Sequence, residues 1–262
     1  MLIQVWLVGS DSVFDAALRR LPEGYLVRAL ADWSEVISAL RAEGADPVVV
    51  FDPYGETGEL DPGMLGVRAE FPSVALVAAM HVDSRSAGDV LTLGEWGVAS
   101  ILTRALDTGP VRMEQRIREA RHRAALQSVL RALPSSPSPR ARPLLEAALG
   151  AAVAGCGVAT LSERLYLSGR TLQRRMGRAG LPAPRQVIAW MRTLVAARLL
   201  DDPGRSANSA AQAAGYASYA ALHRAFQRVR LPSPGTARSH GSVLSAAARA
   251  FAASARTPPG AA

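Results

Sequence analysis

The strongest constraint on the fold is the stretch from Ser206 to Arg228, SANSAAQAAGYASYAALHRAFQR. Small residues at 210, 211 and 214 predict a short helix that another helix can approach closely. Gly215 ends that helix, since a residue without Cβ accepts the left-handed conformation that such a stop needs. Ser218 is a suitable N-cap for a following helix. The stretch therefore predicts a helix, a tight turn and a second helix.

The second of these helices has a buried side and an exposed side. Leu222 and Phe226 lie four residues apart and predict a buried stripe. The residues expected to face outward are His223, Arg224, Gln227 and Arg228. A short helix with an exposed arginine-rich face, braced by another helix, is typical of a DNA-reading helix-turn-helix.

The same layout occurs about fifty residues earlier, from Thr160 to Arg178. Leu161 and Leu165 belong to its first helix, the turn is 166–169, and Ser168 is the expected N-cap. Leu172 and Met176 face inward, while the outward residues are Arg170, Gln173, Arg174 and Arg175. Arg174 and Arg224 occupy matching places, each two residues after the inward leucine. Between the units, apolar residues at 187, 188, 191, 194, 195 and 199 predict one connecting helix, Arg185–Leu200.

This pair resembles the DNA-binding domain of the AraC/XylS family of bacterial transcription regulators. The resemblance covers about residues 144–238. It rests on S-G-R-T-L-Q-R-R-M at 168–176, A-A-R-L-L at 196–200, A-x-x-A-G-Y at 211–216, L-H-R-A-F at 222–226 and L-P-S-P at 231–234. Two departures are Arg230-Leu231, where the family has an aromatic residue and a glycine, and Ala237, where an aromatic residue is common. The resemblance implies a sequence-specific regulator with promoter DNA and RNA polymerase as partners.

Two recognition helices, about Gly169–Arg178 and Ser218–Arg228, are expected to enter successive major-groove segments about one DNA turn apart. We predict that Arg174 and Arg224 read guanine O6 and N7, and that Gln173 and His223 add base contacts. Phosphate or base contacts are predicted for Arg170, Arg175, Tyr219 and Arg228. The alternative for each arginine is an exposed helix face that contacts only water.

Charge is divided unevenly along the chain. Residues 1–112 hold 8 Arg against 16 Asp and Glu, a net charge of −8, whereas residues 113–262 hold 22 Arg against 6, a net charge of +16. A strongly basic half suits a polyanion. Because the chain contains no Lys, an arginine-rich background also contributes to this charge. The single cysteine, Cys156, indicates a reducing compartment, and no signal peptide or membrane span is recognisable, so we expect a cytoplasmic protein.

The N-terminal half alternates short apolar runs with helical patterns. Strands are expected at 2–8, 25–29, 47–51, 74–77 and 99–102, with helices at 12–20, 33–43, 63–70 and 87–94. This alternation predicts a doubly wound, flavodoxin-like parallel sheet of five strands in the order 2-1-3-4-5. The expected domains are a receiver-like α/β domain at 1–110, a connecting helix and Pro/Ser linker at 111–143, an all-α double helix-turn-helix domain at 144–238, and an Ala-rich tail at 239–262. Within this tail, Val243–Ala255 has a weak helical pattern, and the final residues are expected to be disordered.

This half resembles a response-regulator receiver domain through D-P-V-V-V-F-D at 46–52 and G-V-A-S-I-L-T-R-A at 97–105. The resemblance places Asp52 at the phosphoacceptor position. The supporting residues depart from the family, with Gly9 and Ser10 replacing an acidic pair, Ala78 replacing Thr or Ser, and Arg104 replacing a lysine. Phosphoryl transfer needs a metal held by clustered acids, so a pseudo-receiver for signal input or dimerisation is the favoured interpretation. One alternative is that Asp52 is phosphorylated. The simplest alternative is that Asp52 only ends the strand and caps or terminates a loop.

The helix Val111–Leu133 could serve as a dimer contact or pack on its own sheet. Its stripe is Met113, Ile117, Ala120, Ala124 and Leu130, and its arginines are expected to be solvated. Two further classes of function stay open. An enzyme is disfavoured because no glycine-rich phosphate loop, metal-ligand cluster or catalytic set is recognisable, so no cofactor, metal or catalytic residue is predicted. A protein-interaction adaptor that has lost DNA binding is disfavoured by the arginines.

Overall fold

The computed structural model describes residues 2–9, 12–54, 58–83, 86–103, 106–107, 109–237, 239 and 241–256. They form two compact units, divided within one helix. The N-terminal unit runs to Ala125, and the C-terminal unit begins at Leu126, with Asp202–Gly204 grouped with the first.

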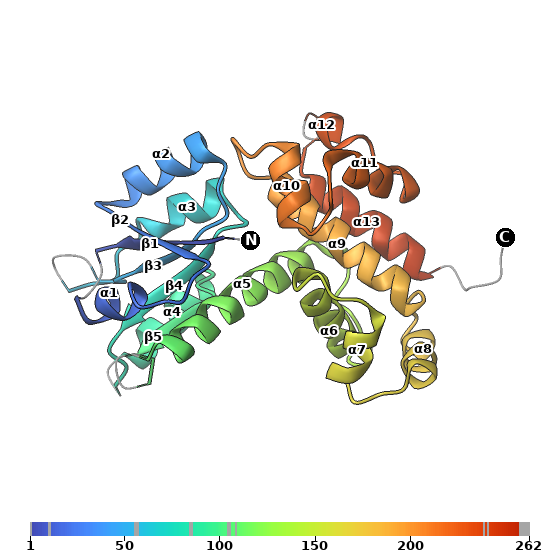
Figure 1. Cartoon of the computed structure of the whole chain (residues 1–262), viewed down its shortest axis with the longest axis horizontal. Coiled ribbons are helices and arrows are strands. Elements are labelled where there is room, and N and C mark those ends of the chain that lie inside the picture. Colours follow the sequence, from blue (N-terminus) through green and yellow to red (C-terminus); the bar gives the residue numbers. More distant parts are fainter. Residues whose placement is uncertain are drawn as a thin grey trace. The chain divides into compact units, whose positions relative to one another are not determined.

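The N-terminal unit is a parallel sheet with helices on both faces (Figure 1). Its elements are β1 Ile3–Val8, α1 Ser12–Leu18, β2 Tyr25–Leu30, α2 Trp33–Glu43, β3 Val48–Phe51, α3 Met64–Glu70, β4 Ala75–Met80, α4 Ala87–Glu95, β5 Ser100–Thr103 and α5 Pro110–Ala132. The strand order is β2-β1-β3-β4-β5 and every pair is parallel. The predicted doubly wound sheet and its strand order are confirmed.

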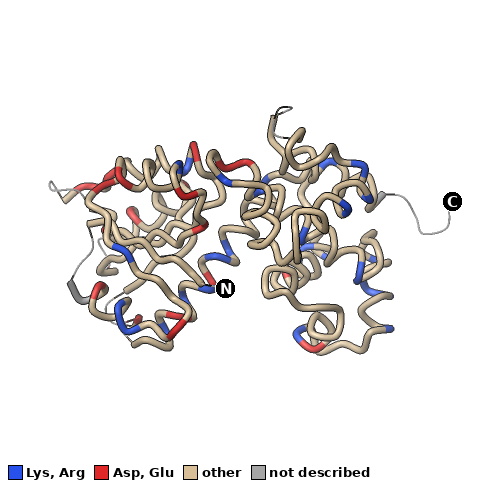
Figure 2. The backbone as a smooth tube through the Cα atoms, turned by 45° about the horizontal axis from the view of Figure 1, so that its top comes forward, with Lys and Arg blue, Asp and Glu red and all other residues tan. Residues whose placement is uncertain are grey.

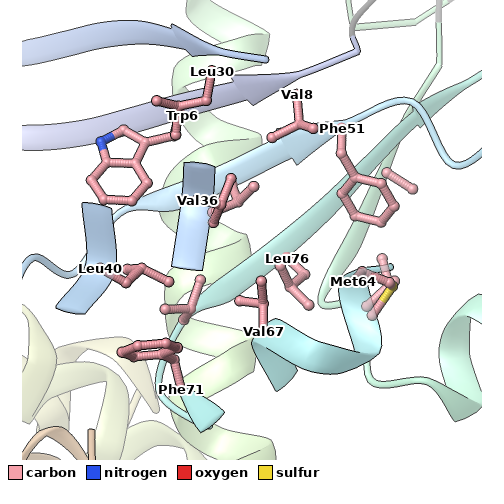
Figure 3. Close-up of a cluster of buried hydrophobic side chains, with 14 of the residues drawn as sticks. Trp6, Val8, Leu30, Val36, Leu40, Phe51, Met64, Val67, Phe71 and Leu76 are labelled. Atoms are coloured by element: carbon pink, nitrogen blue, oxygen red, sulfur yellow. The ribbon is translucent and has the colours of Figure 1, made fainter. Parts of the chain in front are cut away.

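Alternate side chains of the central strands fill two separate cores, because successive residues of a strand point to opposite faces. On one face, Trp6, Phe51 and Leu76 pack with Leu40 of α2 and Val67 of α3 (Figure 3). The opposite core joins α1 and α5 to the other strand positions, and includes Val5, Val50, Val77, Phe14 and Ile117. Burial on both faces explains why the strands read as nearly continuous apolar runs.

The fourth strand is longer than the sequence pattern predicted. β4 ends at Met80 rather than at Val77, and all six of its residues are buried. Ala78 lies beside Phe51 inside the sheet, and Met80 pairs with Thr103. The two alanines at 78 and 79 have weak strand propensity, but burial between β3 and β5 holds them in the sheet.

Helix α5 packs on its own sheet. Met113, Ile117, Ala120 and Ala124 are buried as predicted, whereas Leu130 is only half-buried. The expectation that its arginines are solvated is wrong for Arg116 and Arg121, which are half-buried and paired, whereas Arg123 is exposed and donates to a backbone carbonyl. Arg116 Nε lies 3.0 Å from Asp107 Oδ1, Arg121 Nη2 lies 2.9 Å from Asp46 Oδ2, and Arg123 Nη1 donates to the Ala99 carbonyl at 2.9 Å.

Asp107 is the anchor of the segment that enters α5. Its carboxylate is buried, accepts the Thr103 amide at 3.0 Å, and raises the pKa of the Arg116 guanidinium through a hydrogen bond and its charge. These arginines therefore serve the fold of the N-terminal unit.

The C-terminal unit is all-helical. Besides the end of α5, its elements are α6 Arg142–Val153, α7 Val158–Arg164, α8 Gly169–Arg178, α9 Pro184–Leu200, α10 Ala207–Ala213, α11 Tyr219–Arg228, α12 Pro234–Ala237 and α13 Val243–Arg256. Helix α9 is the centre of the unit, since it contacts α6, α7, α8, α10, α11 and α13. All the apolar positions on which its prediction rested are buried.

Two boundaries in this unit differ from the sequence interpretation. Arg142 and Pro143 belong to the first turn of α6 rather than to the linker, since proline is well tolerated there. The segment interpreted as a tail contains α13, in which Phe251 packs edge-on against Trp190 with ring centroids 5.6 Å apart. The disorder expected for the last residues concerns 257–262, which lie outside the described residues.

Among the residues that the structure describes, no helix is both long and apolar enough to cross a bilayer.

Candidate nucleic-acid interface

Helices α8 and α11 are built on one plan, as the sequence predicted. The hydroxyl of Ser168 accepts the Thr171 amide at 3.2 Å, and that of Ser218 accepts the Ala221 amide at 3.2 Å. Each N-cap satisfies a backbone donor that the first helical turn leaves free. Leu172 and Met176 of α8 are completely buried, and so are Leu222 and Phe226 of α11.

The two helices align residue for residue at a separation of fifty positions. The residues that pair in this way include Ser168 with Ser218, Leu172 with Leu222, Gln173 with His223, Arg174 with Arg224, Met176 with Phe226, Arg178 with Arg228, Pro182 with Pro232 and Pro184 with Pro234. The chain thus repeats a structural unit, and the side chains that face outward in one copy have counterparts in the other.

Each recognition helix ends in the same hydrogen-bonded stop. The Leu181 amide donates to the Met176 carbonyl at 2.9 Å, and the Leu231 amide donates to the Phe226 carbonyl at 2.9 Å. The residue before each donor is left-handed, with φ of +71° at Gly180 and +57° at Arg230. Arg230 therefore adopts a backbone conformation that favours glycine.

The predicted reading face is open to solvent on both helices. The exposed residues on α8 are Arg170, Gln173, Arg174 and Arg175, and those on α11 are Tyr219, Arg224 and Arg228; His223 is half-buried. Within the described part of the chain, none of these arginines forms an ion pair with a carboxylate. From Arg164 to Arg256 the sequence holds only two acids, Asp201 and Asp202, as the sparse red in this part of Figure 2 shows.

The carboxylate of Asp201 has a structural role. It accepts the Val243 amide at 2.6 Å and the Ser242 hydroxyl at 2.8 Å, which caps the beginning of α13. The reading face therefore keeps an uncompensated positive charge, which is what attraction to DNA phosphates requires.

Tyr219 and His223 form a stacked pair at the beginning of α11. Their ring centroids lie 6.0 Å apart and the ring planes differ by 3°. Residues four apart share one helix face, so the tyrosine ring limits the orientations that the imidazole can adopt. Both residues were predicted at the interface from their helical positions, whereas their contact with each other was not predicted.

Arg178 was not among the predicted contacts, and some arginines of the basic half are too buried to reach DNA. Arg178 is exposed and shares one face of α8 with Arg170 and Arg174, since these residues are spaced four apart. The fifty-residue repeat, which pairs it with Arg228, would have identified it. In contrast, Arg198 and Arg205 are only 5% and 1% exposed, so part of the basic charge of this half is inside the domain.

Asp52 lies where the receiver resemblance places it, directly after β3. Its Oδ1 accepts the Tyr54 amide at 2.9 Å, and the Tyr54 hydroxyl donates to Asp89 Oδ2 at 3.0 Å. Burial, then the hydrogen bond to Asp89 and the nearby carboxylates, raise the pKa of the Tyr54 phenol to about 12. The carboxylate of Asp52 thus holds the turn that follows the strand.

Of the residues at the positions that support phosphorylation in a receiver, Ala78 is among the described ones. Ala78 is buried inside β4 and offers no hydroxyl. Ser10 and Arg104 lie outside the described residues. Within the residues that are described, no three His, Cys, Asp or Glu side chains gather as a metal site would require.

Comparisons with known proteins agree with the C-terminal assignment. Residues 161–240 match the model of a family described as a helix-turn-helix domain. No curated protein sequence matches the chain. Full-length FixJ from B. japonicum resembles 89% of this chain over 97% of its own, at 15% identity and a TM-score of 0.33. The RcsB response regulator of Salmonella typhimurium resembles 72% of this chain over 98% of its own, also at 15% and 0.33.

The C-terminal unit therefore contains a helix-turn-helix domain, and this domain follows an α/β domain with a five-stranded parallel sheet. The helix-turn-helix domain is of the AraC type, which confirms the resemblance on which the C-terminal prediction rested.

Proposed function

We propose that this chain is a sequence-specific transcription regulator that reads two successive major-groove segments, one with α8 and one with α11. The observation that carries the proposal is the repeat itself. Two capped helices bury matched apolar pairs and expose matched arginines, Arg174 and Arg224, on a surface almost without acidic residues.

Helix α9 sets how the two helices act together. It contacts both of them, and it is buried along nearly its whole length from Val187 to Leu200. A buried connecting helix cannot bend or extend at small cost, so the two reading helices keep one spacing. We expect half-sites about one DNA turn apart, which need not be palindromic because the two helices differ in sequence.

The roles of individual side chains follow from their chemistry. Arg174 and Arg224 can each donate two hydrogen bonds to guanine O6 and N7, with Gln173 and His223 beside them as further base contacts. The surrounding side chains anchor the domain to phosphates without selecting sequence. These are Arg170, Arg175, Tyr219 and Arg228.

Selection of bound sequences from a random DNA pool tests this proposal directly. The full chain should enrich a motif of two half-sites about one turn apart, and the affinity for the winning sequence should fall steeply with salt. Enrichment of no motif, with weak binding of every sequence, would contradict it. That outcome would favour an adaptor that keeps the fold but has lost sequence reading.

For the N-terminal unit we propose a pseudo-receiver that serves signal input or dimerisation. Asp52 is engaged in its turn, and Ala78 cannot supply the hydroxyl that the family uses. Exposed apolar side chains at Leu91, Leu106 and Val111, on α4 and around the beginning of α5, are candidates for a contact with a second copy. Sedimentation of the full chain over a range of concentrations measures that association.

Acetyl phosphate tests the alternative in which Asp52 is phosphorylated. With Mg²⁺ present, we expect no labelled adduct, because the described part of the chain gathers no cluster of acids around Asp52 that would hold the metal. An adduct on the native chain that is lost in Asp52→Ala would establish a phosphorylation-controlled regulator instead. RNA polymerase is the further partner that fits a promoter-bound regulator, and the cytoplasm is the compartment that goes with this proposal.

A further inference from the structure

We propose that Tyr166 contacts the DNA backbone beside the first half-site, with its hydroxyl donating a hydrogen bond to a phosphate oxygen. The inference rests on the proposed function, and it adds a positioning contact that neither the repeat nor the family match supplies. Tyr166 lies in the turn between α7 and α8.

The backbone conformation at this position calls for glycine. Tyr166 is left-handed with φ of +53°, and the residue in the same place in the turn between α10 and α11 is Gly215, with φ of +78°. The separation here is forty-nine rather than fifty, because one more residue stands before the N-cap in the second unit. The hydrogen bonds are the same in both turns. The Leu167 amide donates to the Ser162 carbonyl and the Tyr216 amide to the Ala211 carbonyl, each at 2.9 Å. Glycine thus makes this turn at lower cost, and a tyrosine at 166 strains the free domain.

The side chain does not compensate for that strain by packing. Tyr166 is 95% exposed. The packing role at this turn belongs to the next residue in each unit, Leu167 in the first and Tyr216 in the second, both half-buried. The Tyr216 hydroxyl lies 3.1 Å from Thr193 Oγ1, inside the domain. Backbone strain that no packing contact of the side chain compensates is characteristic of functional positions.

The location of Tyr166 indicates the partner. It lies two residues before Ser168, the N-cap of α8, and the N-terminal end of a recognition helix is the end that enters the major groove. Side chains that flank this end face phosphates, and tyrosine is among the residues that bind them. Arg170 follows within one turn, and no acidic residue occurs from Arg164 to Leu200, although Glu163 precedes this stretch.

Three substitutions in the full chain test the contact on the DNA sequence that selection returns. Tyr166→Phe removes only the hydroxyl, Tyr166→Gly removes the whole side chain, and Tyr166→Arg replaces the donor by a cation. We expect Phe and Gly each to weaken binding about tenfold, by the same factor for every sequence of the first half-site. Arg should recover the affinity and steepen the slope of log affinity against log salt by about 0.9.

Stability separates this role from a structural one. Because Tyr166→Gly relieves the left-handed strain, it should raise the melting temperature of the helical signal by about 3 °C while it weakens DNA binding. Hydrogen exchange at the Leu167 amide should stay as slow as in the native chain. A structural role would instead lower stability and affinity together, and would contradict the proposal.

The remaining outcomes also test whether Tyr166 contacts a DNA phosphate. Native-like binding of Tyr166→Phe overturns the phosphate hydrogen bond, whether or not Tyr166→Gly weakens binding. Loss of promoter activity with unchanged DNA affinity also overturns it and assigns Tyr166 to a protein partner. If the native chain selects no sequence, the proposed function itself is overturned. If the native chain selects a motif and the Tyr166 variants bind it as tightly as the native chain does, only this inference is overturned.

Discussion

The two recognition helices share a framework but differ in charge at the level of single residues. Arg170 and Arg175 of α8 correspond to Ala220 and Ala225 of α11 at the fifty-residue separation. Under the proposed function the two helices are therefore not equivalent, and we expect the first unit to depend more on phosphate contacts and on salt.

Arg174→Ala and Arg224→Ala test base reading. Each should cost about 1–3 kcal/mol of specific binding and relax the sequence choice in one half-site only, because each removes a bidentate donor to one guanine. Repeating the selection from random DNA with each variant measures this. Arg170→Ala is the matched comparison, and its loss should be the same for all sequences. If Arg174→Ala or Arg224→Ala also weakened all sequences equally, these residues would be phosphate contacts.

Arg230→Gly tests the left-handed stop at the end of α11. Gly180 fills the same place at the end of α8, with the same pair of hydrogen bonds. Glycine should therefore stabilise the C-terminal unit by about 1 kcal/mol, since it removes the steric cost of a left-handed side chain. Urea unfolding followed by the helical signal measures the change. Arg230→Ala keeps the strain and should show no comparable gain, and destabilisation by Arg230→Gly would contradict this explanation.

At the level of elements, α13 is a structural part of the C-terminal unit. Val243, Leu244, Ala247, Ala248 and Phe251 are all buried, and Asp201 caps the beginning of the helix. The sequence pattern of α13 looked weak because seven of its fourteen residues are alanine, so its buried and exposed sides differ little in composition. Alanines bury little area each, but they allow close approach to α9.

Phe251→Ala tests this packing. Loss of a buried aromatic side chain against Trp190 should destabilise the C-terminal unit by about 3 kcal/mol, through lost burial and the cavity that remains. Arg249→Ala, on the exposed side of the same helix, should change stability by less than about 0.5 kcal/mol. Equal effects of the two substitutions in urea unfolding would show that α13 does not pack as described.

Helix α5 shows how far a pattern predicts an element. Its apolar positions from Met113 to Ala124 were predicted and are buried. Its arginines were misinterpreted because Asp46 and Asp107 are distant in sequence or lie in a loop, so periodicity within the helix gives no sign of them. Pairing with those acids directs Arg116 and Arg121 to their own sheet.

For the molecule as a whole, the rigid α9 makes the spacing of the half-sites a sharp prediction. Inserting 5 base pairs between them should abolish the contribution of one helix, because the second half-site turns to the opposite side of the DNA. Inserting 10 base pairs restores the side but not the distance, and should not restore affinity. Competition binding on the three DNAs measures this. Native affinity with the longer insert would mean that the two helices move independently.

The sequence by itself determined the two-part architecture, the sheet order, the two helix-turn-helix units and the positions of their caps. These features rest on local signals, such as the apolar strand runs, the serines at 168 and 218 and the glycine at 215, whose effects reach only a few residues. The exposed and buried sides of α8 and α11 were also recognisable, because helical spacing alone separates Arg174 from Leu172 and Arg224 from Leu222.

Only the tertiary structure decided which cations remain available and which weak elements persist. Arg198 and Arg205 are buried, Arg116 is paired, and α13 is held on α9 by burial of Phe251 together with small side chains. The left-handed conformation of Tyr166, with its side chain in solvent, was likewise invisible in the sequence. The physical reason is the same for all of these residues. Whether each side chain is buried, paired or exposed depends on the residues that pack around it from distant parts of the chain, and local sequence spacing gives no information about those residues.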